Sequence, residues 1–234
     1  MPRERVAPLP SFDPRELPVS EAHDGLPPVP AERLRAPALR ERFANPPAWH
    51  VEQTDDRFRI DHEDPREAAV LEPIVEHDDG TTLLLTQRAW NLRHHSGQVA
   101  FPGGRLEPTD ASPVDAALRE AHEEIGLEPS RVEIIGPLPE YLTGTGFLVT
   151  PIVGLLPPGL VLRPDPSEVA DIFEVPLAFL MNPRHHQRRS VRIESGAERS
   201  FFTMPYCVPG ETEERFIWGA TAAMLRNLYR LLAA

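Results

Sequence analysis

The 234-residue sequence predicts an α/β (α+β) fold in which a mixed β-sheet is sandwiched between helices. Two observations predict this class. From residue 66 onward, short segments rich in Leu, Val, Ile and Thr alternate with turn-forming residues, as in a series of strands. Two amphipathic helices interrupt and end that series. Because 41% of the residues are hydrophobic, we expect one main domain with an appendage rather than two equal domains.

The appendage is a proline-rich N-terminal extension over residues 1–30. Proline lacks an amide donor and blocks helices, so we expect this stretch to be an extended arm. The main domain covers residues 31–234. It opens with the segment 31–44, in which Leu34, Leu39 and Phe43 have near-helical spacing and Pro37 predicts a kink.

The strands of the main domain are bounded by Gly, Pro, Asp and Ser, which favour turns. Two of them, 132–142 and 147–156, flank the sequence Thr-Gly-Thr-Gly and predict a hairpin. Residues 167–181 predict a short strand followed by a helical turn. The remaining strands are predicted at 68–76, 81–89, 98–104, 190–195 and 200–206.

The second helix ends the chain. Its apolar residues recur at intervals of three and four, which places them on one face that we expect to cover the sheet. The stripe consists of Ile217, Thr221, Met224, Leu225, Leu228, Leu231 and Leu232.

Composition excludes several classes of function. A net charge of -12 argues against nucleic-acid binding, which needs a basic surface. The sequence starts without the apolar core of a secretory signal, and its most apolar stretch, 147–162, contains three prolines and is too short for a membrane span. Cys207 is the only cysteine, which fits a reducing compartment. We therefore expect a soluble cytoplasmic protein that binds neither nucleic acid nor membrane.

The first of the two helices, 112–127, has clear boundaries. Ser112 is a good N-cap, Pro113 suits the first helical position, Asp115 lies near the positive end of the helix dipole, and Gly126 is placed to end the helix.

This helix concentrates negative charge on one face. Glu120, Glu123 and Glu124 fall within an arc of roughly 100°. Like charges at this spacing destabilise a helix, but three carboxylates are good oxygen ligands for a hard divalent cation. The alternative is a solvated acidic face on which Arg119 bridges to Glu123.

The sequence before the helix favours the metal site. Gly104 lies fifteen residues before Arg119, and a glycine lets backbone atoms approach a metal or phosphate. Here the chain resembles the Nudix hydrolases, whose box is G-x5-E-x7-R-E-U-x-E-E-x-G-U, with U apolar. Residues 119–127, "REAHEEIGL", match every specified position, with Ala121 a small occupant of its apolar slot. Asp110 stands where the box has glutamate, one residue further from Arg119, and its role is left open.

A second resemblance points to one branch of the family. Residues 84–104, "LLTQRAWNLRHHSGQVAFPGG", are similar to the signature that precedes the box in coenzyme A pyrophosphatases. In that branch the acidic position and longer spacing of the box also look like those here, and the terminal "FIWGATAAML" resembles the branch's last helix. The resemblance covers about residues 66–234. The matching residues are Leu84, Leu85, Thr86, Arg88, Ala89, Arg93, Gly97, Phe101, Pro102, Gly103 and Gly104.

The resemblance implies a Nudix fold over residues 31–234 and a pyrophosphohydrolase acting on phosphoric anhydride bonds with Mg²⁺ or Mn²⁺. It implies that Glu120, Glu123 and Glu124 are metal ligands, that the Gly104 carbonyl is a further one, and that Arg119 orients the cluster. Which glutamate acts as general base stays open.

Other residues are expected to contact the substrate. Arg88 and Arg93 are candidates for gripping its phosphates, with pairing to local acids as the alternative. His95 has a structural or a substrate-contact role, and Glu168 would supply an extra carboxylate from a loop facing the box. The neighbouring His94 is expected to be an exposed loop residue.

The expected reaction is cleavage of the diphosphate of coenzyme A or its thioesters to 3',5'-ADP and (acyl-)phosphopantetheine. One alternative is a Nudix hydrolase of another nucleotide derivative: ADP-ribose, a dinucleotide or a non-standard nucleotide. Another is a non-catalytic Nudix-fold binding module, which the retention of all three glutamates disfavours. The expected partner is thus a small nucleotide, and a homodimer is left open.

Overall fold

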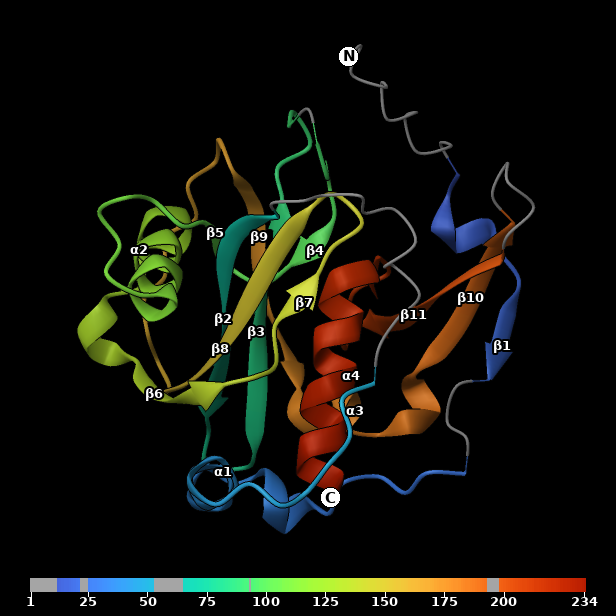
Figure 1. The fold of residues 1–234 in the computed structure, drawn as a ribbon, viewed down its shortest axis with the longest axis horizontal. Helices are drawn as coiled ribbons and strands as arrows, with labels where there is room; N and C mark the ends of the chain where they lie inside the picture. The colour runs from blue at the N-terminus through green and yellow to red at the C-terminus, as the bar shows by residue number, and fades with distance from the viewer. Residues whose placement is uncertain (1–11, 22–24, 53–64, 93, 193–197) are drawn as a thin grey trace.

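The computed structural model describes residues 12–21, 25–52, 65–92, 94–192 and 198–234. These residues form two β-sheets (Figure 1). The larger, eight-stranded sheet contains β2 (Arg66–Glu76), β3 (Thr81–Arg88), β4 (Val99–Ala100), β5 (Gly103–Arg105), β6 (Glu133–Pro137), β7 (Tyr141–Leu142), β8 (Phe147–Leu156) and β9 (Val169–Pro176). The smaller, four-stranded sheet has the order β1 (Val19–Glu21), β10 (Gln187–Arg192), β11 (Glu198–Cys207) and β12 (Glu214–Trp218).

The helices are α1 (Ala36–Ala44), α2 (Pro113–Ile125), α3 (Leu177–Leu180) and α4 (Gly219–Ala233), with short 3₁₀ turns at Pro14–Glu16, Ala31–Leu34, Pro129–Arg131 and Pro183–His185. In the larger sheet, β2 runs parallel to β8, and the other strand pairs are antiparallel. The sheet is therefore mixed, as predicted.

The two long helices cover opposite faces of the larger sheet. On one face, Ala117, Ala121 and Ile125 of α2 are fully buried against Leu71 of β2 and Ile152 of β8. On the other face, apolar residues of α4 share one core with both sheets. Helix α4 consequently lies between the larger and the smaller sheet (Figure 1). The predicted sandwich is confirmed, with the smaller sheet as an additional layer.

Strand β12 corrects the predicted extent of the last helix. Ile217 was expected on the helical stripe, but it lies on β12 and pairs with Met204 of β11. The helix begins only at Gly219, which has a φ of 62°. Because β12 completes the smaller sheet, pairing with β11 outweighs the helical spacing of Ile217.

Three smaller differences concern segment boundaries. Pro37 lies in the first turn of α1, so the helix begins there instead of bending. The segment 98–104 forms two short strands, because β4 pairs with β3 whereas β5 pairs with β2. The segment 132–142 likewise forms two strands, β6 and β7, which both pair with β8.

Part of the N-terminal extension joins the smaller sheet. Val19–Glu21 pairs with β10, an interaction that local sequence did not indicate. Arg189 of β10, which is 8% exposed, donates through Nη1 to the carbonyls of Pro14, Arg15 and Leu17. None of the helices in the described parts of the chain is long and apolar enough to span a membrane.

Strand β2 carries a buried acid. Glu72 has no exposed surface, and it shares the face of β2 that Ile74 turns toward the core around α4. Among the described residues, neither of its carboxylate oxygens has a hydrogen-bond partner. Burial raises the pKa of Glu72 to about 8. At neutral pH this carboxyl is therefore mainly protonated.

Candidate active site

Helix α2 positions the acidic cluster because both of its ends are fixed. The hydroxyl of Ser112 accepts a hydrogen bond from the backbone amide of Asp115 at 3.2 Å, which caps the first turn. Gly126 ends the helix at a φ of 66°, a left-handed conformation that favours glycine. Between these caps, the three glutamates differ in exposure: Glu124 is 4% exposed, whereas the side chain of Glu123 is 58% exposed.

Arg119 holds the cluster together through one guanidinium group. Its Nε and Nη2 donate to the two carboxylate oxygens of Asp110 at 3.0 and 2.9 Å. Its Nη1 donates to Glu120 at 2.9 Å and to Glu123 at 3.2 Å. The hydrogen bond from Arg119 lowers the pKa of Asp110, and the bond to Asp110 raises the pKa of Arg119. Asp110, whose role the sequence left open, is thus the two-point anchor of Arg119.

The contact between Asp110 and Arg119 predicts that Asp110 positions the acidic cluster. Asp110→Asn removes the negative charge that fixes Arg119, and we expect hydrolysis to fall by about tenfold or more, as for partners that orient metal ligands. Asp110→Glu keeps a carboxylate and should retain more activity. Steady-state kinetics over a range of Mg²⁺ concentrations checks this. The exposed turn residue Asp79 supplies a matched Asp→Asn control, and equal rates for Asp110→Asn and Asp79→Asn would contradict the anchoring role.

Gly104 allows the backbone to approach the cluster. A Cβ atom at this position would lie 2.5 Å from the carboxylate carbon of Glu120, so any other residue here would displace the Glu120 side chain. Next to it, the amide of Gly103 donates to Oε2 of Glu124 at 3.1 Å. The glycine pair thus brings strand β5 against the acidic face of α2.

The cluster contains more negative charge than Arg119 neutralises. Burial raises the pKa of Glu124 to about 7, and burial likewise raises that of Glu120. Glu168 contributes to both increases, so this exposed loop residue lies close enough for its charge to act on the cluster. Excess carboxylate oxygens in a partly buried site are the donor set that Mg²⁺ and Mn²⁺ prefer.

The acidic side chains of the described residues do not converge on a single point. Among the described residues, no three Asp, Glu, His or Cys side chains are already set as the ligands of a metal ion. The carboxylates of Glu120 and Glu123 are held apart because Arg119 Nη1 lies between them and pairs with both. The chemistry of the donors fits a divalent cation, which would compete with Arg119 for these two carboxylates.

The predicted substrate residues have different surroundings. Arg88 Nη1 lies 3.8 Å from Oε1 of Glu124, which brings this arginine beside the cluster. Its Nε is buried and has no hydrogen-bond partner among the described residues. His95 is exposed, adopts a φ of 56°, and its Nδ1 lies 2.8 Å from Oε1 of Gln98. His94 is exposed, as expected. Arg93 lies outside the described residues.

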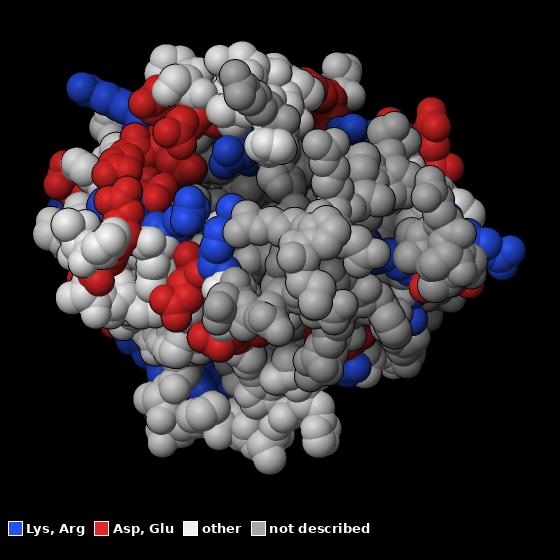
Figure 2. Space-filling model, turned by 45° about the horizontal axis from the view of Figure 1, so that its top comes forward, with Lys and Arg blue, Asp and Glu red and all other residues white. Residues whose placement is uncertain are grey.

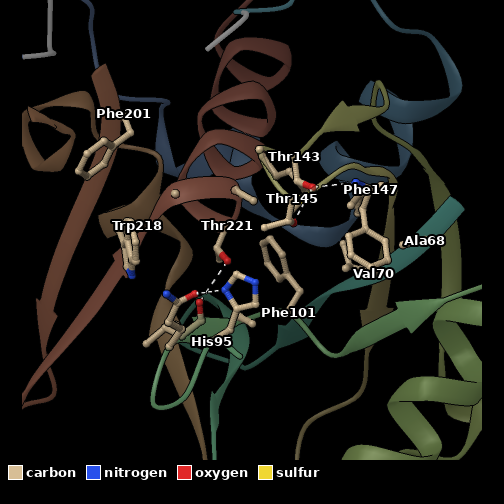
Figure 3. A pocket seen from close by; sticks show the side chains of 18 of the residues that line it. Ala68, Val70, His95, Phe101, Thr143, Thr145, Phe147, Phe201, Trp218 and Thr221 are labelled. Atoms are coloured by element: carbon tan, nitrogen blue, oxygen red, sulfur yellow. Dashed lines mark hydrogen bonds between the residues drawn. The ribbon is translucent and has the colours of Figure 1, made fainter. Parts of the chain in front are cut away.

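A cavity adjoins the cluster, and sequence reasoning did not find it. It has a volume of about 550 Å³ and lies between the two sheets, and Arg88, His95 and Gly104 belong to its wall. Most of its lining is apolar. Figure 3 shows Val70 and Phe147 of the larger sheet on one side and Phe201 and Trp218 of the smaller sheet on the other. These residues are far apart in the sequence, so no local pattern pointed to the cavity.

The surface near the cluster is strongly polarised. Figure 2 shows Asp and Glu side chains gathered on the side of the molecule where α2 lies, with basic side chains between them and a hollow in the same face. Arg88 and Arg105 are among the residues that line the cavity. An anionic ligand therefore meets arginines beside the carboxylates.

Several known proteins have sequences similar to this chain. The family profile described as NUDIX domain matches residues 63–193. The protein named Uncharacterized Nudix hydrolase NudL from Salmonella heidelberg is 45% identical over 174 residues, which is 74% of this chain and 86% of the relative. Its namesake from Escherichia coli is 44% identical over 163 residues, 70% of this chain and 81% of the relative.

Among solved structures, the Nudix hydrolase RenU from M. smegmatis aligns with a TM-score of 0.43 and 24% identity, covering 56% of this chain and 80% of that one. The family profile spans more than half of the sequence, and the NudL relatives are matched over most of their length. The chain belongs to the Nudix hydrolase family.

Proposed function

We propose that this Nudix hydrolase cleaves the diphosphate of coenzyme A or its thioesters, releasing 3',5'-ADP and (acyl-)phosphopantetheine. One observation carries the proposal: residues of the 84–104 stretch that resembles coenzyme A pyrophosphatases border both the carboxylates and the cavity. Arg88 lies beside Glu124 and lines the cavity, and Gly104 lies against Glu120 and lines the same cavity. A substrate that joins a diphosphate to a long second group fits this adjacency.

The reaction requires that water approach a diphosphate whose negative charge repels nucleophiles. Nudix hydrolases use divalent cations, and Glu120, Glu123 and Glu124, with the Gly104 carbonyl, are the residues that would hold one here. Bound Mg²⁺ or Mn²⁺ would neutralise phosphate oxygens and lower the pKa of water. The exposed Glu168 is a candidate for an additional carboxylate.

The protein groups have separable tasks. Arg119, anchored on Asp110, sets the positions of Glu120 and Glu123. Arg88, whose Nη1 lies 3.8 Å from Oε1 of Glu124, would bind a phosphate oxygen beside the cluster. Burial raises the pKa of Glu124 to about 7 in the absence of a cation, so binding of a divalent cation to this carboxylate would displace a proton near neutral pH. His95 contacts the substrate at the wall of the cavity, and Arg93 stays a candidate for a second phosphate contact.

The second candidate is a Nudix hydrolase acting on ADP-ribose, a dinucleotide or a non-standard nucleotide. The arginines and carboxylates would serve any diphosphate, but the mainly apolar cavity favours a substrate with an apolar part.

The exposed Cys207 is the only cysteine, so no internal disulfide forms, which fits a reducing cytoplasm where coenzyme A is present.

A substrate panel separates these functions by product identity. Coenzyme A, acetyl-coenzyme A, ADP-ribose, NADH, a diadenosine polyphosphate and a set of nucleoside triphosphates are incubated with the full chain and Mg²⁺ or Mn²⁺. We expect 3',5'-ADP from the coenzyme A compounds at the highest kcat/KM in the panel. Preferential hydrolysis of another compound would establish the second candidate, and absence of 3',5'-ADP would overturn the first.

A further inference from the structure

The cavity has two sides with different chemistry. On the side of the larger sheet lie Arg88, Gly104 and Arg105, next to the carboxylate cluster. On the side of the smaller sheet, the rings of Phe201 and Trp218 pack with their centroids 5.6 Å apart. The second side therefore presents aromatic surface, whereas the first combines arginines with apolar side chains such as Val70 and Phe147.

Helix α4 completes the apolar side. Ala220 and Met224, from its first two turns, belong to the wall, and Thr221 lies between them. The Thr221 hydroxyl donates to the carbonyl of Val99 at 3.1 Å, so it already has a partner within the protein (Figure 3). Arg199 and Ser200 of β11 also line the cavity. The surface formed by Trp218 and α4, however, offers little to the polar edge of a nucleobase, whereas a hydrocarbon chain needs no hydrogen bonds there.

The apolar side lies outside the match to the NUDIX domain. Phe201, Trp218, Ala220 and Met224 follow residue 193, where the match to the NUDIX domain ends. They come from β11, β12 and α4, the elements that build and cover the smaller sheet. A general diphosphate-cleaving site would not need this wall, so its chemistry bears on which substrates the enzyme prefers.

We propose that the apolar side of the cavity, formed by Phe201, Trp218, Ala220 and Met224, binds the acyl chain of coenzyme A thioesters and makes them better substrates than free coenzyme A. This inference rests on the proposed function and adds the class of substrate. A cavity of about 550 Å³ is in the range of small-molecule sites, which leaves room for hydrocarbon beyond the diphosphate. Burial of each methylene lowers the free energy of the bound state and of the transition state alike, so the gain should be in KM.

The first test is a chain-length series on the wild-type enzyme with Mg²⁺. Free, acetyl-, butanoyl-, hexanoyl- and octanoyl-coenzyme A are compared by the rate of 3',5'-ADP release. We expect kcat/KM to rise by up to about fourfold for each added methylene, mainly through KM, until the cavity is filled. Equal kcat/KM values along the series would overturn this inference and leave the proposed function standing. Absence of 3',5'-ADP from every member would overturn both.

The second test changes the wall in opposite directions. Ala220→Leu adds three carbon atoms to the wall and should lower the octanoyl-to-acetyl ratio of kcat/KM by about tenfold or more, since a single methylene in an apolar pocket already gives about tenfold. Phe201→Leu removes volume and should move the preference toward longer chains. The octanoyl-to-acetyl ratio is compared only for variants that still unfold cooperatively on heating. A result from either variant alone is enough to test the acyl-chain site.

Ala178 supplies the matched control. It is exposed on α3 and is not part of the cavity wall, so Ala178→Leu adds the same side-chain atoms elsewhere. We expect its chain-length ratio to equal that of the wild type. If Ala220→Leu also keeps the wild-type ratio, the acyl chain does not bind against α4, and a nucleobase or solvent occupies this side instead.

Discussion

Glu123→Gln is expected to lower kcat by a factor of about 100 or more, the range seen when one group that stabilises transition-state charge is removed. The substitution keeps the size of the side chain and its hydrogen bond with Arg119, but it removes one negative charge from the cluster. Because the side chain of Glu123 is 58% exposed, the exchange should have little effect on the fold. A loss of activity can then be assigned to weaker binding of the divalent cation.

The measurement combines steady-state kinetics with calorimetric titration of Mn²⁺. Glu120→Gln, made in parallel, should show the same two effects, since Arg119 Nη1 bridges Glu120 and Glu123. Glu128, exposed just beyond the C-terminal end of α2, gives a matched Glu→Gln control that should behave as wild type. Unchanged turnover in Glu123→Gln would refute the assignment of the site and would favour a binding module without catalysis.

The acidic helix could be predicted from the sequence because its determinants are local. Ser112 and Gly126 fix the two ends, and the spacing of the glutamates fixes their common face. The approach of Gly104 to Glu120 was expected from the Nudix resemblance, which encodes a contact between distant elements. The anchoring of Arg119 on Asp110 was not expected, because the extra residue between them hid the pairing from a comparison of spacings.

The cavity and the smaller sheet could not be predicted because they depend on tertiary contacts. Val70 and Phe147 reach the cavity from the larger sheet, whereas Phe201 and Trp218 reach it from strands near the end of the chain. Ile217 shows the difficulty most directly. Its spacing fits the stripe of the last helix, yet pairing with β11 draws it into a strand.

Glu72 illustrates a different limit of sequence reasoning. A glutamate within a strand usually marks a face in contact with water. Here α2 and α4 cover both faces of the larger sheet, so the carboxyl is enclosed. Whether a strand has a solvated face depends on which helices pack against it, and this information is absent from the strand itself.

The buried carboxyl makes stability depend on pH in a defined direction. Its pKa of about 8 in the folded protein lies above the ordinary value of 4.5, so the folded state retains a proton that the unfolded chain releases. The contribution of Glu72 is fully present below pH 4.5 and is lost as the pH rises toward 8. Between pH 5 and pH 8, this loss lowers the free energy of unfolding by about 3–4 kcal/mol.

Glu72→Gln removes the titration while preserving the shape of the side chain, so it isolates this effect from packing. We expect the free energy of unfolding of the variant, relative to wild type, to increase by about 3–4 kcal/mol from pH 5 to pH 8. Urea denaturation at both pH values measures it, and other titrating groups cancel in the difference. Glu76→Gln, at the partly exposed end of the same strand, should follow the wild type. A constant difference for Glu72→Gln would mean that this carboxyl reaches water or a charged partner in the folded protein.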